Sequence, residues 1–417
     1  MKQKIVVILI LLLTLISCKK EFNFFQQENE NGLPNYGNVD IENVFTAEDS
    51  QLQDKQNVVN AIQQYYDKVW EKGDLSGGFL VAKGDKILFE SYRGFAKENN
   101  QVPINKDVPL HIASISKSLT AMAVLKLVEA RKINLHDKVT HYFPKFPYKE
   151  VEVIHLLNHR SGLPKYEYFI EKLGIKPKNK YFTNQEVLDL LIQYKPDLAR
   201  NTNTGFMYCN TNYALLALIV EKVTAHPFPL AMQKIVFKPL GMEHTYIFQQ
   251  KDSLRAAQSF YYQGNRLYPT DKLDGIYGDK NCYTTPRDLF KFSKAMYAEN
   301  FLRKSLKDSI FTPYSNERRG VNNYGIGFRM KVFDNGEKLT FHNGWWHGSN
   351  TAFVHLQKSK VTIIALGNKF SRRVYSALTL SSLFEDFPLE REKLNKLMNK
   401  ETDTTKENHD AAAESTE

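Results

Sequence analysis

The sequence predicts an α+β fold in which one antiparallel sheet is flanked by helices and carries an inserted, mainly helical region. Three observations lead to this prediction. Strand-like runs lie at 77–92, soon after the folded part begins, and at 338–341, 349–356 and 361–367, close to its end. The stretch between them, about 115–310, has mostly helical periodicity. We therefore expect strands from both ends of the chain to pair in one sheet, with the helical region beside it.

The first strands are predicted to form a hairpin. Their two runs, 77–82 and 86–92, are joined through Gly84 and Asp85, a turn composition typical of hairpins. Further helices are expected where apolar residues recur at helical spacing. These are 58–70 before the hairpin, and 187–194, 213–223 and 288–298 in the central region.

Length and composition limit the kind of protein. The 417 residues exceed the ~250–300 at which one hydrophobic core usually stops growing, which favours two lobes or two domains. A 12% aromatic content argues against general disorder. The net charge is +10, but the Lys and Arg residues are scattered and accompany no nucleic-acid-binding signature. A nucleic-acid partner is therefore not expected.

The N-terminus carries an export signal. Lys2 and Lys4 precede an apolar run at 5–16, which is too short to span a bilayer but suits a signal peptide. The run ends in Leu-Ile-Ser-Cys at Cys18, which resembles the lipobox of bacterial lipoproteins. We therefore expect a signal peptide at 1–17, acylation of Cys18, and a membrane-anchored protein of the cell envelope, facing the periplasm or the cell surface.

The remaining boundaries follow from composition. Residues 18–52 are rich in Asn, Gln and Glu and are interrupted by Gly and Pro, which predicts a flexible tether. The stretch 396–417 is almost without apolar residues and is predicted to be a disordered tail. The folded domain is thus expected at 53–395.

Cysteine and histidine patterns do not indicate a metal site or a cofactor. Cys209 and Cys282 remain in the exported chain, and the sequence leaves open whether they form a disulfide or stay as buried thiols. His155 and His159 have helical i, i+4 spacing, but the glutamate of a zinc-protease motif is missing. No metal and no cofactor are expected.

A candidate nucleophile lies at the start of a predicted helix, 115–130. Apolar residues fall on one helical face, which predicts an amphipathic helix; they are Ile115, Leu119, Met122, Ala123, Leu127 and Ala130. Ser114 begins this helix, and Lys117 follows three residues later, close enough for a hydrogen bond. A serine hydroxyl needs such a base to become nucleophilic. A capping serine with a solvated lysine would show the same spacing.

The surrounding motifs favour a catalytic role for Ser114 and Lys117 over a capping serine with a solvated lysine. The stretch 112–120, Ile-Ala-Ser-Ile-Ser-Lys-Ser-Leu-Thr, resembles the first active-site motif of class C β-lactamases and of the related esterases and D-stereospecific peptidases. Leu-Leu-Asn-His-Arg-Ser-Gly-Leu-Pro at 156–164 is similar to the loop that follows in this family. The resemblance covers about 61–384 and implies a β-lactamase/transpeptidase-like fold.

Tyr208-Cys209-Asn210, followed by a predicted helix, is similar to the Tyr-x-Asn motif of this family. The resemblance implies that Tyr208 moves a proton between Ser114 and the leaving group, and that Asn210 hydrogen-bonds Lys117 and the substrate. A nearby ammonium would assist a phenol in this role. Without the other motifs, a half-buried core tyrosine would be the simpler interpretation.

His342-Asn343-Gly344 matches the third motif of this family, Lys/His-x-Gly on a strand. We expect Gly344 to let a substrate lie against the strand edge. The resemblance places the backbone N–H groups of Ser114 and Trp345 in the oxyanion hole. His342 departs from the lysine of β-lactamases, which moves the expected activity away from β-lactams and toward esters and peptides.

The resemblance implies a serine hydrolase that forms an acyl-enzyme with a small ester, amide or peptide, peptidoglycan fragments among the candidates. One alternative is a cell-wall D-amino-acid peptidase. Another is a catalytically silent relative that binds peptidoglycan through the same cleft, since a fold does not guarantee an activity.

Overall fold

The computed structural model describes residues 36–98, 102–317 and 320–399. The predicted signal peptide, Cys18 and the first half of the predicted tether lie outside these residues, as does the predicted tail from residue 400 onward.

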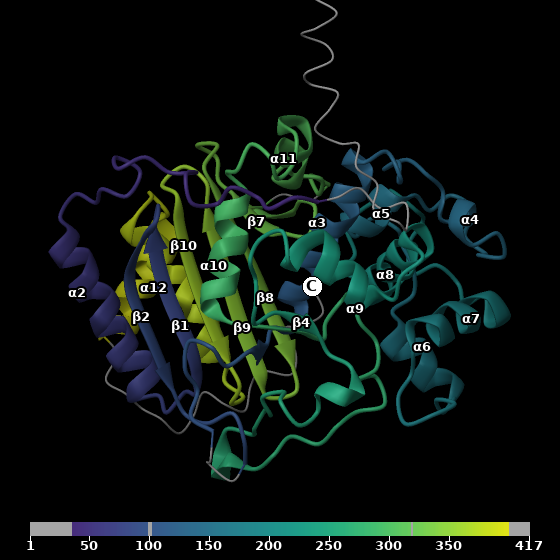
Figure 1. Cartoon of the computed structure of the whole chain (residues 1–417), viewed down its shortest axis with the longest axis horizontal. Coiled ribbons are helices and arrows are strands. Elements are labelled where there is room, and N and C mark those ends of the chain that lie inside the picture. The colour runs from purple at the N-terminus through teal and green to yellow at the C-terminus, as the bar shows by residue number, and fades with distance from the viewer. Residues whose placement is uncertain (1–35, 99–101, 318–319, 400–417) are drawn as a thin grey trace, which may run out of the picture.

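A seven-stranded antiparallel sheet forms one side of the molecule (Figure 1). Its strands, in the order β2-β1-β10-β9-β8-β7-β6, are β2 Lys86–Arg93, β1 Gly77–Lys83, β10 Val361–Gly367, β9 Ser349–Leu356, β8 Lys338–Trp346, β7 Arg329–Val332 and β6 Asn322–Tyr324. The predicted hairpin is confirmed as β1 and β2. Pairing of Gly77 with Gly367 joins the two ends of the domain, so the predicted sheet topology is also confirmed.

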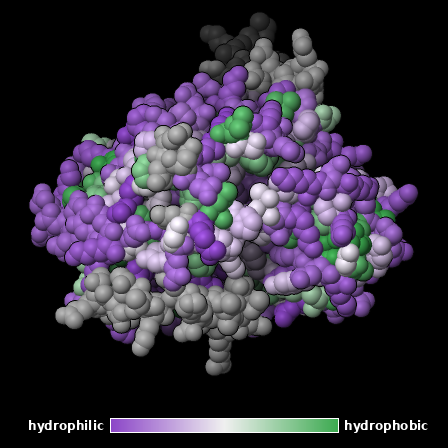
Figure 2. All heavy atoms as spheres, turned by 90° about the horizontal axis from the view of Figure 1, so that it is seen from below, coloured by the Kyte–Doolittle hydropathy of each residue, from purple (hydrophilic) through white to green (hydrophobic). Residues whose placement is uncertain are grey.

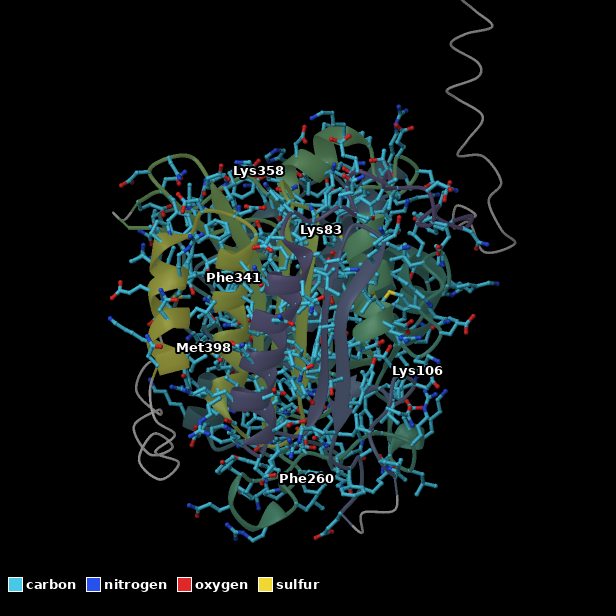
Figure 3. All side chains as sticks on the ribbon, turned by 90° about the vertical axis from the view of Figure 1, so that its left-hand side faces the viewer. Lys83, Lys106, Phe260, Phe341, Lys358 and Met398 are labelled. Atoms are coloured by element: carbon cyan, nitrogen blue, oxygen red, sulfur yellow. The ribbon has the colours of Figure 1, made fainter. Side chains whose placement is uncertain are left out.

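Helices cover both faces of this sheet. On one face, residues of α2 and of the 3-10 segment η7 form a hydrophobic cluster with the strands, and Ile62, Phe79 and Ile363 are fully buried in it. On this face α12 packs on η7, and α2 contacts η7 through Tyr65 and Ser376 (Figure 3). On the opposite face, α10 packs on β1 and β10 (Figure 1). The bounds are α2 Lys55–Tyr66, continued by the π-helical η2 Asp67–Glu71, then α10 Pro286–Ala295, η7 Arg372–Leu383 and α12 Pro388–Asn399.

The central region forms a helical lobe beside the sheet (Figure 1). Its α-helices are α3 Ser116–Glu129, α4 Val139–Tyr142, α5 Val153–Leu157, α6 Tyr166–Leu173, α7 Asn184–Tyr194, α8 Asn210–Thr224, α9 Phe228–Met232 and α11 Lys304–Ile310. Short 3-10 and π segments accompany them: η3 Ala113–Ile115, η4 Gln233–Phe237, η5 Gln250–Asp252 and η6 Gln263–Asn265. A small sheet orders β3 Leu110–His111, β5 Cys282–Thr284 and β4 Tyr246–Ile247. A core shared by the lobe and the sheet face holds the two parts together.

Helix α3 is buried on all sides, so the prediction of a single apolar face was wrong. Its polar side chains are buried as well. The Ser116 Oγ accepts the Cys282 N–H at 3.2 Å, and four others each donate a hydrogen bond to a backbone carbonyl of a neighbouring segment. The pairs are Lys117 with Asp279 at 2.8 Å, Ser118 with Gly327 at 2.6 Å, Thr120 with Gly278 at 2.8 Å and Lys126 with Phe301 at 2.5 Å. The helix is therefore fixed in position around its whole circumference.

Both predicted boundaries of the domain need correction. Val39 and Ile41 are buried in the main core, and the Val39 N–H donates to the Pro239 carbonyl at 2.8 Å. The second half of the predicted tether is thus packed on the domain, because two apolar side chains are enough to dock a polar segment. At the other end, the first four residues of the predicted tail, 396–399, complete α12.

Cys209 and Cys282 are both buried and free. Of the two possibilities that the sequence left open, the structure therefore has the buried thiols and not the disulfide.

Within the described ranges no single helix is long and apolar enough to cross a membrane. One bent pair, α8 with the helices of 228–237, passes this test by length and composition, but its side chains are mostly buried in the core. The face seen in Figure 2 is mainly hydrophilic, with hydrophobic side chains in small separate groups.

Candidate active site

Ser114 and Lys117 meet as their spacing predicts. Ser114 lies in η3, the short 3-10 turn that leads into α3. The Lys117 Nζ donates to the Ser114 Oγ at 2.9 Å and to the Asp279 carbonyl at 2.8 Å. The Lys117 side chain is completely buried, which excludes the solvated lysine of the alternative interpretation. A buried amine in contact with a hydroxyl at a helix start can serve as a base toward that hydroxyl.

The residue before Ser114 has an unusual backbone conformation. Ala113 has φ 47°, a left-handed conformation that costs energy for a residue with a Cβ. Its neighbour Ile112 is held on both backbone groups: the N–H donates to the Cys282 carbonyl at 3.0 Å, and the carbonyl accepts from Thr351 Oγ1 at 2.9 Å. These bonds to β5 and β9 hold the strained turn and thereby orient Ser114.

Tyr208 lies directly beside this pair. The Lys117 Nζ is 5.0 Å from the centroid of the Tyr208 ring, and the Arg329 guanidinium carbon is 4.6 Å from the same centroid. Two basic side chains therefore adjoin the Tyr208 ring. Arg329 also lines a cavity of about 560 Å³ together with Arg200, Phe206 and Asn323.

His159 positions Tyr208, a role that the sequence did not reveal. The two rings are 4.4 Å apart. The His159 Nδ1 accepts the backbone N–H of Cys209 at 3.2 Å and contacts the Asn212 side-chain amide at 3.1 Å. Complete burial lowers the pKa of His159 well below its usual value, so the ring is neutral. The sequence places His159 in a family loop, but only the fold brings that loop against the Tyr-x-Asn segment.

The expected bond between Asn210 and Lys117 is absent. The Asn210 side chain instead donates to Glu167 Oε1 at 2.7 Å, and the hydrogen bonds of Lys117 go to Ser114 and Asp279. The physical reason is that the Asp279 carbonyl occupies the acceptor position next to the ammonium. None of the sequence motifs that point to the site includes Asp279.

His342 is a buried structural residue of β8. Its Nδ1 lies 2.7 Å from the Asn343 carbonyl, so this nitrogen carries the proton, and Nε2 accepts from the Tyr324 hydroxyl at 3.2 Å. Burial lowers the pKa of His342 well below its usual value, and the neighbouring charges of Arg329 and Lys117 act in the same direction. The motif therefore presents no fixed charge to a substrate.

Gly344 is required by the protein's own backbone. A Cβ at this position would overlap Thr351 Oγ1 and the Ile112 carbonyl and would lie 3.0 Å from the Ala113 Cβ. The expectation that this glycine makes room for a substrate is thus corrected: it makes room for the turn that carries Ser114. Beyond Phe341, β8 pairs only with β9, and its other edge lies against η3. This close approach brings Trp345 to the site.

We expect Gly344→Ala to lower the free energy of unfolding by about 1–3 kcal/mol, since overpacked sites cost that much. It should also lower kcat/KM, because the added methyl pushes the Ser114 turn away from β8. Gly37→Ala is the matched control, since a Cβ there meets no atom within 4 Å. Chemical denaturation and ester hydrolysis measure the two effects. Equal stability of the two variants would contradict the close approach.

Residues 345–347 divide between the surface and the interior. Trp345 is 45% exposed and forms a surface beside the nucleophile turn. Trp346 and His347 turn inward, and both bond to Asp274 Oδ1 at 2.8 Å. They line a second cavity, of about 270 Å³. Ser114, Lys117 and Tyr208 line neither of these two cavities.

Comparisons with known proteins agree with this geometry. Residues 62–380 match the family model described as beta-lactamase. The chain is 30% identical over 344 residues to penicillin-binding protein 4* of Bacillus subtilis, covering 79% of this chain and 76% of that protein. A penicillin-binding protein from Bacillus halodurans is 26% identical, with a TM-score of 0.67 over 76% of this chain and 98% of that one. The D-amino acid amidase of Ochrobactrum anthropi SV3 shares the fold at 23% identity, with a TM-score of 0.63 over 78% and 99% of the two chains.

Proposed function

The chain belongs to the beta-lactamase family, and we propose that it is a serine hydrolase that cleaves an ester or amide through an acyl-enzyme on Ser114. The observation that carries this proposal is the 2.9 Å contact between the Ser114 Oγ and the completely buried Lys117 Nζ. A structural serine–lysine pair would not need a strained turn before the serine and an adjacent phenol that also contacts Arg329.

The proposed reaction has two halves. In the first, neutral Lys117 accepts the Ser114 proton while its own N–H still donates to the Asp279 carbonyl, and the Ser114 oxygen bonds to the substrate carbonyl carbon. The N–H groups of Ser114 and Trp345 bind the oxygen that becomes negative. Tyr208 passes the proton to the departing alcohol or amine. In the second half, water loses a proton to the same groups while its oxygen bonds to the acyl carbon. The bond to the Ser114 oxygen then breaks, that oxygen takes the proton back, and the acid is released.

The neutral His342 supports esters and amides over substrates that need an anchored carboxylate. The alternative of a cell-wall D-amino-acid peptidase acts through the same chemistry and differs only in the leaving group. A silent peptidoglycan-binding relative would have the cleft without the reactivity.

A fluorophosphonate probe tests the proposal. The activated Ser114 oxygen should bond to phosphorus and displace fluoride, so that mass spectrometry finds one adduct on the peptide that contains Ser114. The untreated protein should release p-nitrophenol from a short-chain p-nitrophenyl ester. Folded protein with neither adduct nor turnover would favour the silent binder.

We also propose that acylated Cys18 anchors the protein to a membrane, on the strength of the signal peptide and lipobox resemblance. Each acyl CH₂ buried in the bilayer contributes ~0.8 kcal/mol, so several chains anchor durably. After cell fractionation, Cys18→Ala protein should move from the membrane to the soluble fraction. Membrane-bound Cys18→Ala protein would exclude the anchor.

A further inference from the structure

The hairpin turn between β8 and β9 determines which way the Trp345 N–H points. Trp346 pairs with Ser349 across the two strands, which leaves residues 347–348 as a two-residue turn. The residues that flank such a turn exchange both of their backbone hydrogen bonds, and the next pair along the strands exchanges none. That next pair is Trp345 with Asn350. The Trp345 N–H therefore points away from β9, toward the edge of β8 that lies against η3.

This turn is strained at His347. The residue has φ 52°, in the left-handed region that glycine adopts most readily. Gly348 occupies the other turn position, where a Cβ would lie 2.4 Å from the Phe260 carbonyl oxygen. The strain therefore falls on a residue that has a side chain, and such a conformation persists only where surrounding contacts hold it.

The Asp274 carboxylate supplies these contacts. Its Oδ1 accepts from the His347 Nε2 and from the Trp346 Nε1, each at 2.8 Å. Its Oδ2 accepts the Asp271 N–H at 2.7 Å. One carboxylate thus bonds to both of the side chains that follow Trp345 in the chain.

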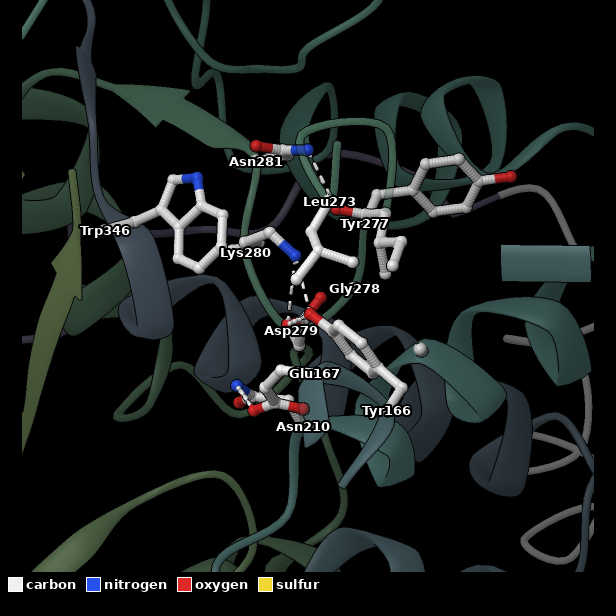
Figure 4. Close-up of polar contacts among 12 residues, drawn as sticks. Tyr166, Glu167, Asn210, Leu273, Tyr277, Gly278, Asp279, Lys280, Asn281 and Trp346 are labelled. Atoms are coloured by element: carbon white, nitrogen blue, oxygen red, sulfur yellow. Dashed lines mark hydrogen bonds and ion pairs between the residues drawn. The ribbon is translucent and has the colours of Figure 1, made fainter. Parts of the chain in front are cut away.

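Further contacts fix this carboxylate and the indole that it binds. The Asp274 carbonyl accepts from the Asn281 Nδ2 at 2.6 Å, which holds the loop that carries the carboxylate. The Lys280 Nζ lies 4.7 Å from the centroid of the Trp346 ring, and Figure 4 shows the two side chains next to each other. The indole is therefore held at its N–H by a carboxylate and on its face by an ammonium, which restricts its orientation.

The bonding pattern at this position requires a carboxylate. Three N–H groups, from an indole, an imidazole and the backbone, donate to its two oxygens, and an ionised carboxylate accepts at both without bringing a donor. Burial alone would raise the pKa of the Asp274 carboxyl, but the hydrogen bonds from His347, the Asp271 N–H and Trp346 hold it below its usual value. The group is therefore charged at neutral pH. An asparagine, with one oxygen and one NH₂, could not accept on both sides.

We infer that Asp274 is a positioning residue for the reaction: through Trp346 and His347 it holds the Trp345 N–H where this group stabilises the oxyanion. The inference rests on the proposed function and extends it to a residue that acts through its neighbours. Fixed donors stabilise the transition state more than the substrate, because the negative charge on the oxygen develops only there. Loss of the Asp274 bonds should therefore lower kcat and leave KM nearly unchanged.

Asp274→Asn tests the inference on a short-chain p-nitrophenyl ester. We expect kcat to fall by about 10- to 100-fold, less than the ~10²- to 10³-fold lost when an oxyanion donor is removed outright, with KM within about threefold of wild type. Phenylboronic acid should inhibit more weakly by a similar factor. The Ser114 oxygen bonds to boron and gives its proton to Lys117, and the tetrahedral anion that results places an oxygen at the oxyanion position.

Asp252→Asn is the matched control. The Asp252 side chain is also buried, and its carboxylate accepts a backbone N–H, that of Gln249, at 2.8 Å. Its other partner, Arg255, lies three residues away at 3.0 Å, so these bonds stay within one loop. We expect this variant to lose stability and to keep the wild-type kcat and the wild-type inhibition by phenylboronic acid.

His347→Gly separates catalysis from stability. Glycine adopts the left-handed turn without strain, so this variant should unfold near the wild-type temperature although it loses the bond to Asp274. We expect it nevertheless to have a lower kcat than wild type. The double variant should lose little more than Asp274→Asn alone, since the two substitutions act through the same bond.

Wild-type kcat and boronate inhibition in folded Asp274→Asn protein would overturn the inference, and so would a loss confined to KM. A loss of the same size in Asp252→Asn would also overturn it, because the cause would then be general destabilisation. A wild-type protein that forms no adduct on Ser114 with either the fluorophosphonate or the boronic acid would refute the proposed function, and the inference with it. Wild-type turnover together with unaffected variants would refute the positioning role alone.

Discussion

The Ser114→Ala variant is expected to lose about ten-thousandfold or more in kcat/KM for ester hydrolysis, because removing the nucleophile of a serine hydrolase leaves only binding and oxyanion stabilisation. It should also fail to form the fluorophosphonate adduct. Its fold should be retained, since Ser114 is half-buried and its loss leaves Lys117 bonded to the Asp279 carbonyl. Steady-state kinetics on purified protein, with circular dichroism to verify folding, measures the loss.

Ser118→Ala is the matched control. Ser118 lies on the same helix and is also hydrogen-bonded, at 2.6 Å to the Gly327 carbonyl, but it is directed away from Lys117. We expect this variant to lose some stability and to keep the adduct and most of the activity. If Ser114→Ala protein still hydrolysed the ester at a rate near that of Ser118→Ala protein, the nucleophile would have to be another residue.

The sheet could be predicted because its strands are marked locally. Short apolar runs, a Gly-Asp turn and a short polar connection identify β1, β2, β9 and β10, and antiparallel neighbours follow from such connections. The position of helix α3 was predicted correctly, but its complete burial was not. Its polar residues Lys117, Ser118 and Thr120 suggested a side that faces solvent, whereas each of them donates a hydrogen bond to a backbone carbonyl within residues 278–327. Periodicity cannot detect acceptors that lie far away in the chain.

The same limit applies to the site. Ser114, Lys117 and Tyr208 stand in motifs whose residue types suggest their chemistry, and the structure brings them together. Glu167, Asp279 and Arg329 have no such local sign, because each acquires its position from a contact between segments at least 40 residues apart, such as Asn210 with Glu167. For Gly344 the motif identified the position correctly, but the predicted reason for a glycine there was wrong. A motif shows that a glycine is present, whereas only the packing shows which atoms exclude a Cβ.

Lys117→Met is expected to lower kcat/KM by about 10²- to 10⁴-fold, the usual contribution of a positioned general base. Methionine has nearly the length of lysine and fills the same buried space, so the main loss is the group that accepts the Ser114 proton. The fluorophosphonate should react with Ser114 more slowly by a similar factor, because the probe depends on the same activated oxygen. Stopped-flow acylation and the rate of adduct formation measure the two losses.

Stability alone would also reduce activity, and α3 provides the control that separates the two causes. Lys126 lies on the same helix, is 5% exposed, and donates to the Phe301 carbonyl, as Lys117 does to Asp279. Lys126→Met should therefore cost at least as much free energy of unfolding, since it leaves both the Phe301 carbonyl and the Glu129 carboxylate, 3.4 Å from the Lys126 Nζ, without their partner. It should nevertheless keep kcat/KM within a few-fold of wild type, because Lys126 lies nine residues beyond Lys117. Similar activity losses in the two variants would mean that Lys117 supports the helix and not the chemistry.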